Sequence, residues 1–302
     1  MMEHLTAVKW NPSTFPFAFF FLRKPNHNSN EIIKKSLSPG DSFNVTISEE
    51  KICIGHSINK EEYYFCNNSV TDQYNRCYTC EQQDFQRCFL FCDASKPFGN
   101  CANSAAYEYC KTHKSSVYLA LIANDVKVGV SFNPLKRWMN QGADVAIEIL
   151  RVKNGFEART IEKQISSDLG ISQAIRKATK AKKLNYNLTR SLPDFRKLTK
   201  DVLSYLENQS LVSEPSDLLH KEISLSSYYG DIPSLDVNPI LNEVEKTLQI
   251  TGIIVGVKGK LLVTKVNNSY YVTNLSKING HLMTFSEKPL KLKGQKSLSE
   301  FF

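Results

Sequence analysis

Eight cysteines, all confined to residues 53–110, constrain the fold of this chain more than any other feature of its sequence. That stretch holds few aliphatic side chains from which a core could be built. Disulfide frameworks belong to secreted chains, and no secretion signal is recognisable in the sequence. Clustered cysteines without such a signal are more often metal ligands. Bound ions would then replace the missing core.

The spacing of the cysteines favours two structural zinc sites. Cys53-Ile-Gly-His56 and Cys77-Tyr-Thr-Cys80 each hold two donors at a spacing that lets both face one tetrahedral ion. The donors of the first site would be Cys53, His56, Cys77 and Cys80, and those of the second Cys88, Cys92, Cys101 and Cys110. Cys66 is left over, and His113 could replace one of the eight. The alternatives are one zinc or free buried thiols, and sites closed by four ligands would not be catalytic.

The remaining composition is that of an ordinary folded protein. Of the 302 residues 41% are hydrophobic and 23% charged, which excludes a disordered, collagen-like or coiled-coil chain. The formal net charge of +8 favours an anionic partner. The longest apolar run, residues 15–22, is too short to cross a bilayer and contains Pro16. It predicts a buried strand and no membrane partner. Since no targeting segment is identifiable, we expect a cytoplasmic location beside the chromosome.

A short α/β pattern follows the cysteines. Two β-branched runs in residues 116–131 flank Asn124-Asp125, which predicts a hairpin. Asn133-Pro134 predicts the start of a helix, and residues 145–152 predict a third strand. Residues 156–169 have apolar side chains at helical spacing. The order β-β-α-β-α predicts an α+β fold, preceded by a zinc-bound part.

Several short motifs occur in order along this segment. They are Ser116-Val117-Tyr118, Lys127-Val128-Gly129, Arg137, the helix Phe156–Glu162, and Leu184-Asn185-Tyr186-Asn187. In this order and spacing, residues 115–188 resemble the GIY-YIG nuclease superfamily. Together with the preceding cysteines, Arg137-Trp138 and Gln141-Gly142-Ala143, most of the chain resembles an uncharacterised branch of that superfamily.

The resemblance implies metal-dependent cleavage of a phosphodiester. Glu162 would hold Mg²⁺ or Mn²⁺, Arg137 would clamp the phosphate, and Tyr118 would orient or deprotonate the attacking water. Lys127 would supply positive charge near Tyr118. The sequence departs from the family at Ser116, in place of glycine, and at Lys127, in place of tyrosine. These departures favour the alternative of a non-catalytic DNA-binding adaptor.

Each of these residues also has an ordinary structural interpretation when it is taken singly. A tyrosine in an apolar strand is often a core residue with one bonded hydroxyl. Arg137 could be a solvated helix residue, and Glu162 could pair with Arg159 or Lys163. It is their order and spacing together that favour an active-site-like arrangement.

A basic segment follows. Ile171, Ala174, Ile175 and Ala178 share one face of an expected helix, so that basic side chains can face outward together. Those assigned to DNA binding are Arg176, Lys177, Lys180, Lys182 and Lys183. They would contact phosphates without reading sequence. The alternative is a solvated helix face.

The rest of the chain is expected to contain helices and a β part. The sequence predicts helices over residues 192–206 and 239–248, a linker between them, and a hairpin followed by a strand over 251–272. The first fifty residues are strand-like and could pair with this β part. The expected divisions are 1–52, 53–114 (zinc-binding), 115–188 (GIY-YIG-like), 189–250 (helical segment and linker), 251–286 (C-terminal β part) and 287–302 (tail).

The last eight residues carry a second resemblance. Gln295, Leu298, Phe301 and Phe302 occupy every defining position of a PCNA-interacting peptide, Gln-x-x-Leu-x-x-Phe-Phe. One helical turn would bring the three apolar side chains to one face as a plug. The resemblance implies that the DNA sliding clamp is a partner, in a cell of archaeal or eukaryotic type. The expected role is structure-specific DNA cleavage in repair or replication. An RNA-binding zinc protein is a further alternative if the tail does not bind a clamp.

Overall fold

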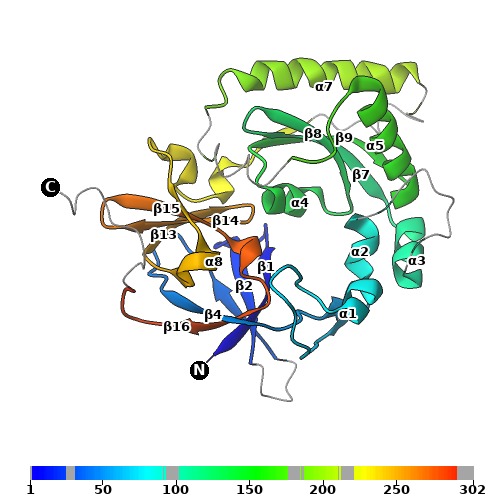
Figure 1. Cartoon of the computed structure of the whole chain (residues 1–302). Helices are drawn as coiled ribbons and strands as arrows, with labels where there is room; N and C mark the ends of the chain where they lie inside the picture. The colour runs from blue at the N-terminus through cyan, green and yellow to red at the C-terminus, as the bar shows by residue number, and fades with distance from the viewer. Residues whose placement is uncertain are drawn as a thin grey trace. The chain divides into compact units, whose positions relative to one another are not determined.

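A computed structural model describes residues 2–24, 31–90, 92, 101, 103–175, 184, 187–209, 211 and 221–290. The chain divides into two compact units (Figure 1). Unit 1 comprises Met1–Gly55, Phe65–Tyr78 and Gly230–Phe302, and unit 2 comprises His56–Tyr64 and Thr79–Tyr229. Both units contain sheets and helices, which confirms the predicted α+β class.

Unit 1 contains a six-stranded antiparallel sheet in the order β12-β4-β16-β1-β2-β3. Its strands are β1 (Glu3–Trp10), β2 (Ala18–Arg23), β3 (Ile32–Ser36), β4 (Val45–Lys51), β12 (Gln249–Ile250) and β16 (His281–Phe285). Alternate side chains such as Leu5, Val8 and Phe20 are buried on one face. Strand β1 pairs with β16, so the first strands of the chain do pair with its C-terminal β part.

A second sheet of unit 1 has the order β11-β15-β14-β13. Its strands are β11 (Ile240–Asn242), β13 (Ile253–Lys258), β14 (Leu261–Val266) and β15 (Ser269–Asn274), which confirms the predicted hairpin and the strand after it. The helix predicted over 239–248 is wrong. Only the short α8 (Val244–Thr247) is helical, because β11 pairs with β15 and Asn242 donates to the Thr273 hydroxyl at 3.1 Å.

Unit 2 contains a sheet in the order β10-β9-β7-β8. Its strands are β7 (Ser115–Ile122), β8 (Asp125–Ser131), β9 (Val145–Val152) and β10 (Glu222–Ser224). Helix α4 (Pro134–Gln141) is capped by Asn133, α5 (Gly155–Leu169) by Asn154, and α7 runs over Ser191–Asn208. The predicted β-β-α-β-α order is therefore confirmed. Strand β10, followed by turns of 3₁₀ helix at Ser226–Tyr228 and Ile232–Ser234, lies where a linker was predicted.

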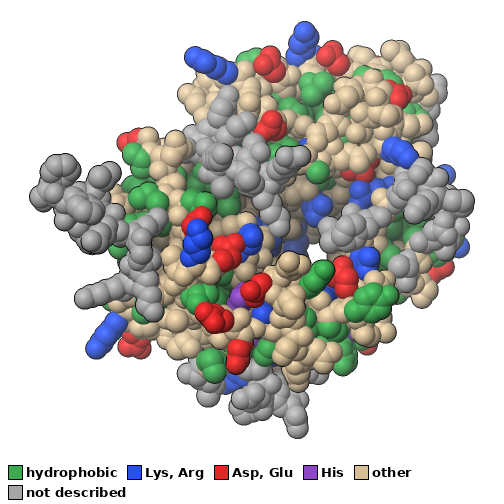
Figure 2. Space-filling view, viewed as in Figure 1, with side chains coloured by type: hydrophobic (Ala, Val, Ile, Leu, Met, Phe, Trp, Pro, Cys, Tyr) green, Lys and Arg blue, Asp and Glu red, His purple; other side chains and the backbone are tan. Residues whose placement is uncertain are grey.

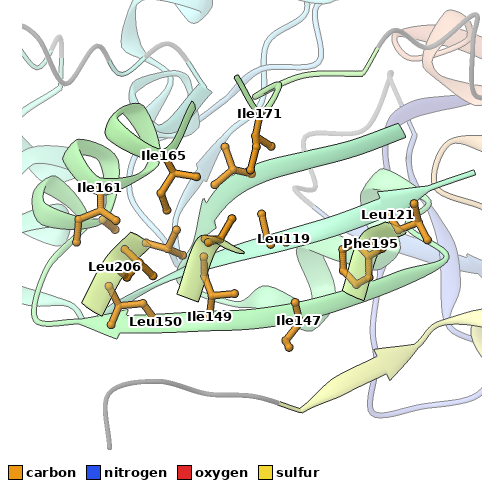
Figure 3. Packing of buried hydrophobic residues seen from close by; sticks show 14 of the residues in the cluster. Leu119, Leu121, Ile147, Ile149, Leu150, Ile161, Ile165, Ile171, Phe195 and Leu206 are labelled. Carbon is orange, nitrogen blue, oxygen red and sulfur yellow. The ribbon is translucent and has the colours of Figure 1, made fainter. Parts of the chain in front are cut away.

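The core of unit 2 joins β7 and β9 to two helices. Ile161 and Ile165 of α5 and Phe195 and Leu206 of α7 belong to the same buried cluster as strand residues such as Leu119 (Figure 3). The core therefore fixes β7 and α5, which carry two of the predicted site residues.

Further short elements of the described structure are β5 (His56–Ser57), β6 (Tyr63–Tyr64), α1 (Tyr78–Gln83), α2 (Phe85–Leu90) and α3 (Ser104–Thr112).

The basic helix predicted from residue 171 is absent from its described part, residues 171–175. Ile171 is instead buried in the core of unit 2, and Ser172 forms a parallel bridge with Lys127. Arg176, Lys177, Lys180, Lys182 and Lys183 lie outside the described residues, as do the four residues assigned to clamp binding.

The surface shown in Figure 2 carries basic and acidic side chains close to one another around α8. Lys246 pairs with Glu243 at 2.5 Å and Lys277 with Glu245 at 2.9 Å. The net positive charge is therefore offset locally at this place. Among the described residues, no helix has both the length and the apolar character needed to span a membrane.

Candidate metal centre and candidate active site

The first candidate site is a group of four cysteines. The sulfur atoms of Cys53, Cys66, Cys77 and Cys80 all lie within 4.8 Å of one another, and three of these residues are buried. The Cys66 and Cys77 sulfurs are 3.9 Å apart. A tetrahedral zinc ion with Zn–S bonds of ~2.3 Å needs sulfurs about 3.8 Å apart. The four thiols therefore fit a structural zinc ion.

Hydrogen bonds to the sulfurs support this assignment. Two backbone N–H groups, from Gly55 and Cys77, donate to the Cys53 sulfur at 3.4 and 3.2 Å. The Asn68 backbone donates to the Cys66 sulfur at 3.5 Å, and its side chain donates to the Cys77 sulfur at 3.6 Å. Such donors stabilise thiolates and orient metal ligands.

The structure places Cys66 in this group, where the knuckle spacing predicted His56. His56 lies in β5, and its ring is 5.1 Å from the ring of Tyr64, its partner across the strand pair. Cys66 is brought in by long-range backbone contacts: the Cys53 N–H donates to the Asn68 carbonyl at 2.8 Å, beside a bridge between Ile52 and Ser69. The donor set consists of four sulfurs.

The other four cysteines lie on or beside two helices that pack against each other. Cys88 is in α2 and Cys110 is in α3, next to Phe89 and Tyr109, whose rings are 6.0 Å apart. Burial, with the neighbouring thiols of Cys92, Cys101 and Cys88, raises the pKa of the Cys110 thiol to about 12, while Arg159 opposes the rise. Burial, with Cys88 and Cys92, also raises the pKa of Cys101. These thiols therefore influence one another electrostatically.

The second candidate site centres on Tyr118 in the middle of β7. Tyr118 is paired with Gly129 on β8 and Glu148 on β9, and only 1% of it is exposed. Its hydroxyl donates to the Gln141 side chain of α4 at 3.1 Å. A Cβ atom on Gly129 would lie 2.5 Å from the tyrosine ring and hydroxyl, so the absence of a side chain there makes room for Tyr118.

Arg137 and Glu162 both act on the Tyr118 hydroxyl. Burial raises the pKa of Tyr118, and the charge and hydrogen bond of Arg137 oppose the rise, whereas the charge of Glu162 adds to it. Arg137 of α4 and Glu162 of α5 therefore both influence the pKa of Tyr118 on β7. At neutral pH such a tyrosine keeps its proton and acts as a hydrogen-bond donor.

Glu162 is 5% exposed and pairs with Arg159 at 2.7 Å, one turn earlier on α5. Arg159 also donates to the Phe89 carbonyl of α2. The guanidinium thus holds the carboxylate in place and compensates its charge, since a buried carboxylate needs a partner. This is the ordinary pairing that the sequence had offered as an alternative to a metal site.

Ser116 has a defined polar environment. Its hydroxyl donates to Glu148 at 2.5 Å, and Arg151 donates to both oxygens of Glu148 at 2.8 and 3.0 Å. Lys127 is buried and its ammonium donates to the Gln173 carbonyl at 2.6 Å. Lys127 lies two positions before Gly129 and on the same face of β8, because alternate residues of a strand share a face.

Sequence reasoning missed two roles in these sites, that of Cys66 in the sulfur group and that of Gln141 beside Tyr118, whereas it had offered the pairing of Arg159 with Glu162. Gln141 follows Arg137 by four positions in a helix, and this spacing places both on one face. That spacing could have identified it. Arg159 precedes Glu162 by three positions, which is the spacing of a helical ion pair.

Comparison with known proteins gives one match. Residues 40–283 match the model of a family described as protein of unknown function (DUF2797). The match covers both candidate sites. No curated protein and no solved structure matches the chain.

Proposed function

Since this chain belongs to the DUF2797 family, whose description specifies no activity, we propose a function for it from its own residues. The protein is a zinc-stabilised, metal-dependent DNA endonuclease of GIY-YIG type that works beside the sliding clamp in repair or replication. The observation that carries this proposal is that the Tyr118 hydroxyl bonds Gln141 of α4, one turn after Arg137, within a β-β-α-β-α unit. Arg137 and Glu162 also influence the pKa of Tyr118.

Each of the three residues has a chemical role that suits phosphodiester hydrolysis. Arg137 neutralises charge that gathers on the phosphate in the transition state. Tyr118 orients the attacking water through its hydroxyl, which Gln141 and Arg137 hold in position. Glu162 would hold Mg²⁺ or Mn²⁺, which would supply charge stabilisation and an activated water. One carboxylate, completed by waters and substrate phosphate, is a usual Mg²⁺ arrangement.

The carboxylate of Glu162 suits this cation only after a local change, because Arg159 already holds one of its oxygens at 2.7 Å. Binding of a cation and a phosphate would draw Arg159 away from Glu162. Arg159 could then donate to the phosphate, as arginine does with its planar fork. We therefore expect the protein to be active only when metal and substrate are both bound, because both are needed to break the Arg159–Glu162 ion pair.

A second candidate function is a non-catalytic DNA-binding clamp adaptor. The observation in its favour is the same Arg159–Glu162 ion pair, together with the nearly complete burial of Tyr118. Ser116 and Lys127 also make ordinary hydrogen bonds at the positions where the GIY-YIG motifs have glycine and tyrosine. In this case the residues around Tyr118 are a stable core, and the basic segment and tail act alone.

The association with DNA and with the clamp rests on the sequence. Gln295, Leu298, Phe301 and Phe302 would anchor the chain to the clamp. Arg176, Lys177, Lys180, Lys182 and Lys183 would contact phosphates. The clamp raises the effective concentration of DNA near the protein, so that its own affinity for DNA can be modest. Work at the clamp also implies a location beside the chromosome, in the cytoplasm of an archaeal-type cell.

A Mg²⁺-dependent cleavage assay on flap, junction, nicked and single-stranded DNAs tests the nuclease. We expect cutting by the wild type and at least about 100-fold slower cutting by Glu162→Gln, since one group that stabilises transition-state charge is typically worth that much. The matched control, Glu157→Gln, replaces a carboxylate near the start of the same helix and should leave the rate unchanged.

The same assay with the clamp present tests the tail. Adding clamp should stimulate the wild type, and a Phe301→Ala/Phe302→Ala variant should lose the stimulation while keeping its basal rate. Absence of cutting on every substrate, with clamp-dependent DNA binding intact, would contradict the nuclease and favour the adaptor. A rate equally slowed in both glutamate variants would also contradict the role of Glu162.

A second zinc ion, held by Cys88, Cys92, Cys101 and Cys110, is part of the proposal. It rests on the spacing of these cysteines in the sequence and on the packing of α2, which carries Cys88, against α3, which carries Cys110. Metal analysis of the purified protein should give two zinc ions per chain and one for Cys110→Ser. A wild-type content of one would contradict this site.

A further inference from the structure

The outward face of β1, β2 and β3 in unit 1 carries a row of phenylalanines that neither candidate site uses. Phe19 and Phe21 occupy alternate positions of β2, so both rings point to the same side of the sheet. Both are partly exposed, whereas Phe20 and Leu22 between and beyond them are fully buried on the opposite side. Along β2, the fully buried Phe20 and Leu22 therefore lie on the face opposite to Phe19 and Phe21.

Lysines from both neighbouring strands flank these rings. Lys9 of β1 pairs with Phe19 and Lys34 of β3 pairs with Phe21. The two ammonium groups lie 4.6 and 5.6 Å from the centre of the Phe21 ring, and both lysines are exposed. Cations at this distance interact with the face of an aromatic ring. The centre of the sheet face is thus aromatic and its flanks are positive.

The row continues at one end and is closed at the other. Toward the β1–β2 connection, the rings of Phe15 and Phe17 lie 5.6 Å apart, and Phe15 is 71% exposed. Toward the other end, Arg23 shares the face of Phe21 but is buried, because it donates to the Cys66 carbonyl at 2.9 Å and lies over the Phe65 ring. The accessible surface therefore consists of Phe15, Phe17, Phe19 and Phe21 with Lys9 and Lys34, which we call the aromatic platform.

We propose that the aromatic platform binds single-stranded nucleic acid, with bases stacked on the phenylalanine rings and phosphates bound by Lys9 and Lys34. A flat ring accepts any base on its face. A base that stacks on Phe21 would displace the ammonium groups of Lys9 and Lys34 from the ring, and these would then neutralise the flanking phosphates. Rings two positions apart on a strand are about 7 Å from each other. That separation suits bases that are splayed apart, as in an unpaired strand, and not the closed stack of a duplex.

The chemistry of the platform distinguishes this ligand from other anions. An acidic peptide would use the two lysines but not the ring faces. A duplex would present phosphates but keep its bases stacked on one another. Only an unpaired strand supplies both partners, which is why aromatic residues interleaved with basic ones are the usual arrangement of single-strand binding surfaces. The inference goes beyond the proposed cleavage and does not depend on it.

Fluorescence anisotropy with a labelled 20-nucleotide oligo(dT) and a 20-base-pair duplex tests the platform. The full-length protein should bind the single strand more tightly, and Phe21→Leu should weaken that binding about 10-fold, the loss expected for one stacked base. Lys9→Gln/Lys34→Gln should reduce the slope of log affinity against log salt concentration by about 1.4, because each phosphate contact on a single strand contributes about 0.7.

The matched control is Lys35→Gln, which removes a lysine next to Lys34 whose ammonium lies 4.4 Å over the Phe285 ring instead. Its affinity should stay within about twofold of the wild type. Thermal melting checks that Phe21→Leu still folds, and the double lysine variant changes only exposed side chains. Failure of the wild type to bind oligo(dT), or equal binding by wild type and both platform variants, would overturn the proposal. Wild-type protein should bind oligo(dT) without added Mg²⁺, under conditions in which the proposed cleavage does not run, so failure of the nuclease and failure of the platform are separate results.

Discussion

Cys66→Ser is expected to remove one zinc ion per chain and to cost the protein several kcal/mol of stability. A structural zinc ion in a small site contributes about 10 kcal/mol or more of binding free energy, and much of it is folding free energy. Cys53 and Cys80 are 0% and 2% exposed, so after loss of the ion they would be left as buried thiols in a segment with little apolar core. Zinc analysis of the purified variant, with its thermal unfolding curve, measures both effects.

The informative control is His56→Asn, which removes the donor that the knuckle spacing selects. Because His56 contacts the Tyr64 ring and lies outside the four-sulfur group, this variant should retain its zinc. A protein that lost zinc on changing His56 but kept it on changing Cys66 would show that the donor set contains the histidine.

Gly129→Ala is the second change with a large expected effect. The new methyl group would lie 2.5 Å from the Tyr118 ring and hydroxyl, closer than any real contact. The ring is confined, since it packs edge-on against Trp138 at 5.8 Å and its hydroxyl is bonded to Gln141. Overpacking of this kind typically costs 1–3 kcal/mol, and we expect about 3 kcal/mol here, or a fall in Tm of about 10 °C.

A double-mutant cycle with Tyr118→Leu identifies the cause of that loss. Leucine is shorter than tyrosine. Its side chain therefore leaves room for the methyl group that Gly129→Ala introduces. The double variant should therefore be more stable than the sum of the two single losses implies, because contacting residues are coupled. Additive losses would mean that a clash with Tyr118 is not the reason why Gly129→Ala destabilises the protein.

The elements around Tyr118 could be predicted because their sequence signals are local. Asn133-Pro134 and Asn154-Gly155 mark the starts of α4 and α5, and both asparagines accept a backbone hydrogen bond as N-caps. The hairpin of β7 and β8 follows from two β-branched runs around a turn. In each case the deciding residues lie within a few positions of one another, so a pattern along the chain contains the information.

The elements that could not be predicted depend on partners far away in the sequence. Strand β11 looked helical, and it is a strand because β15, some thirty residues later, pairs with it in parallel. Cys66 has no second donor at knuckle spacing. It joins the metal group through the backbone contact between Cys53 and Asn68. Spacing along the sequence relates only donors a few positions apart, and for this reason it predicted His56 as the ligand.

The pairing of β1 with β16 has a consequence for the order of events during synthesis on the ribosome. Glu3 lies opposite Met283, so β1 has to wait for almost the entire chain before its partner emerges. The hairpin of β7 and β8 joins residues only a few positions apart and can close far earlier. Until β16 arrives, β1 and β4 each present an unpaired edge, and open edges of this kind are where nascent chains aggregate. Pairing of residues 281–285 with β1 and β4 thus covers these two edges and ends the period in which they are open to aggregation.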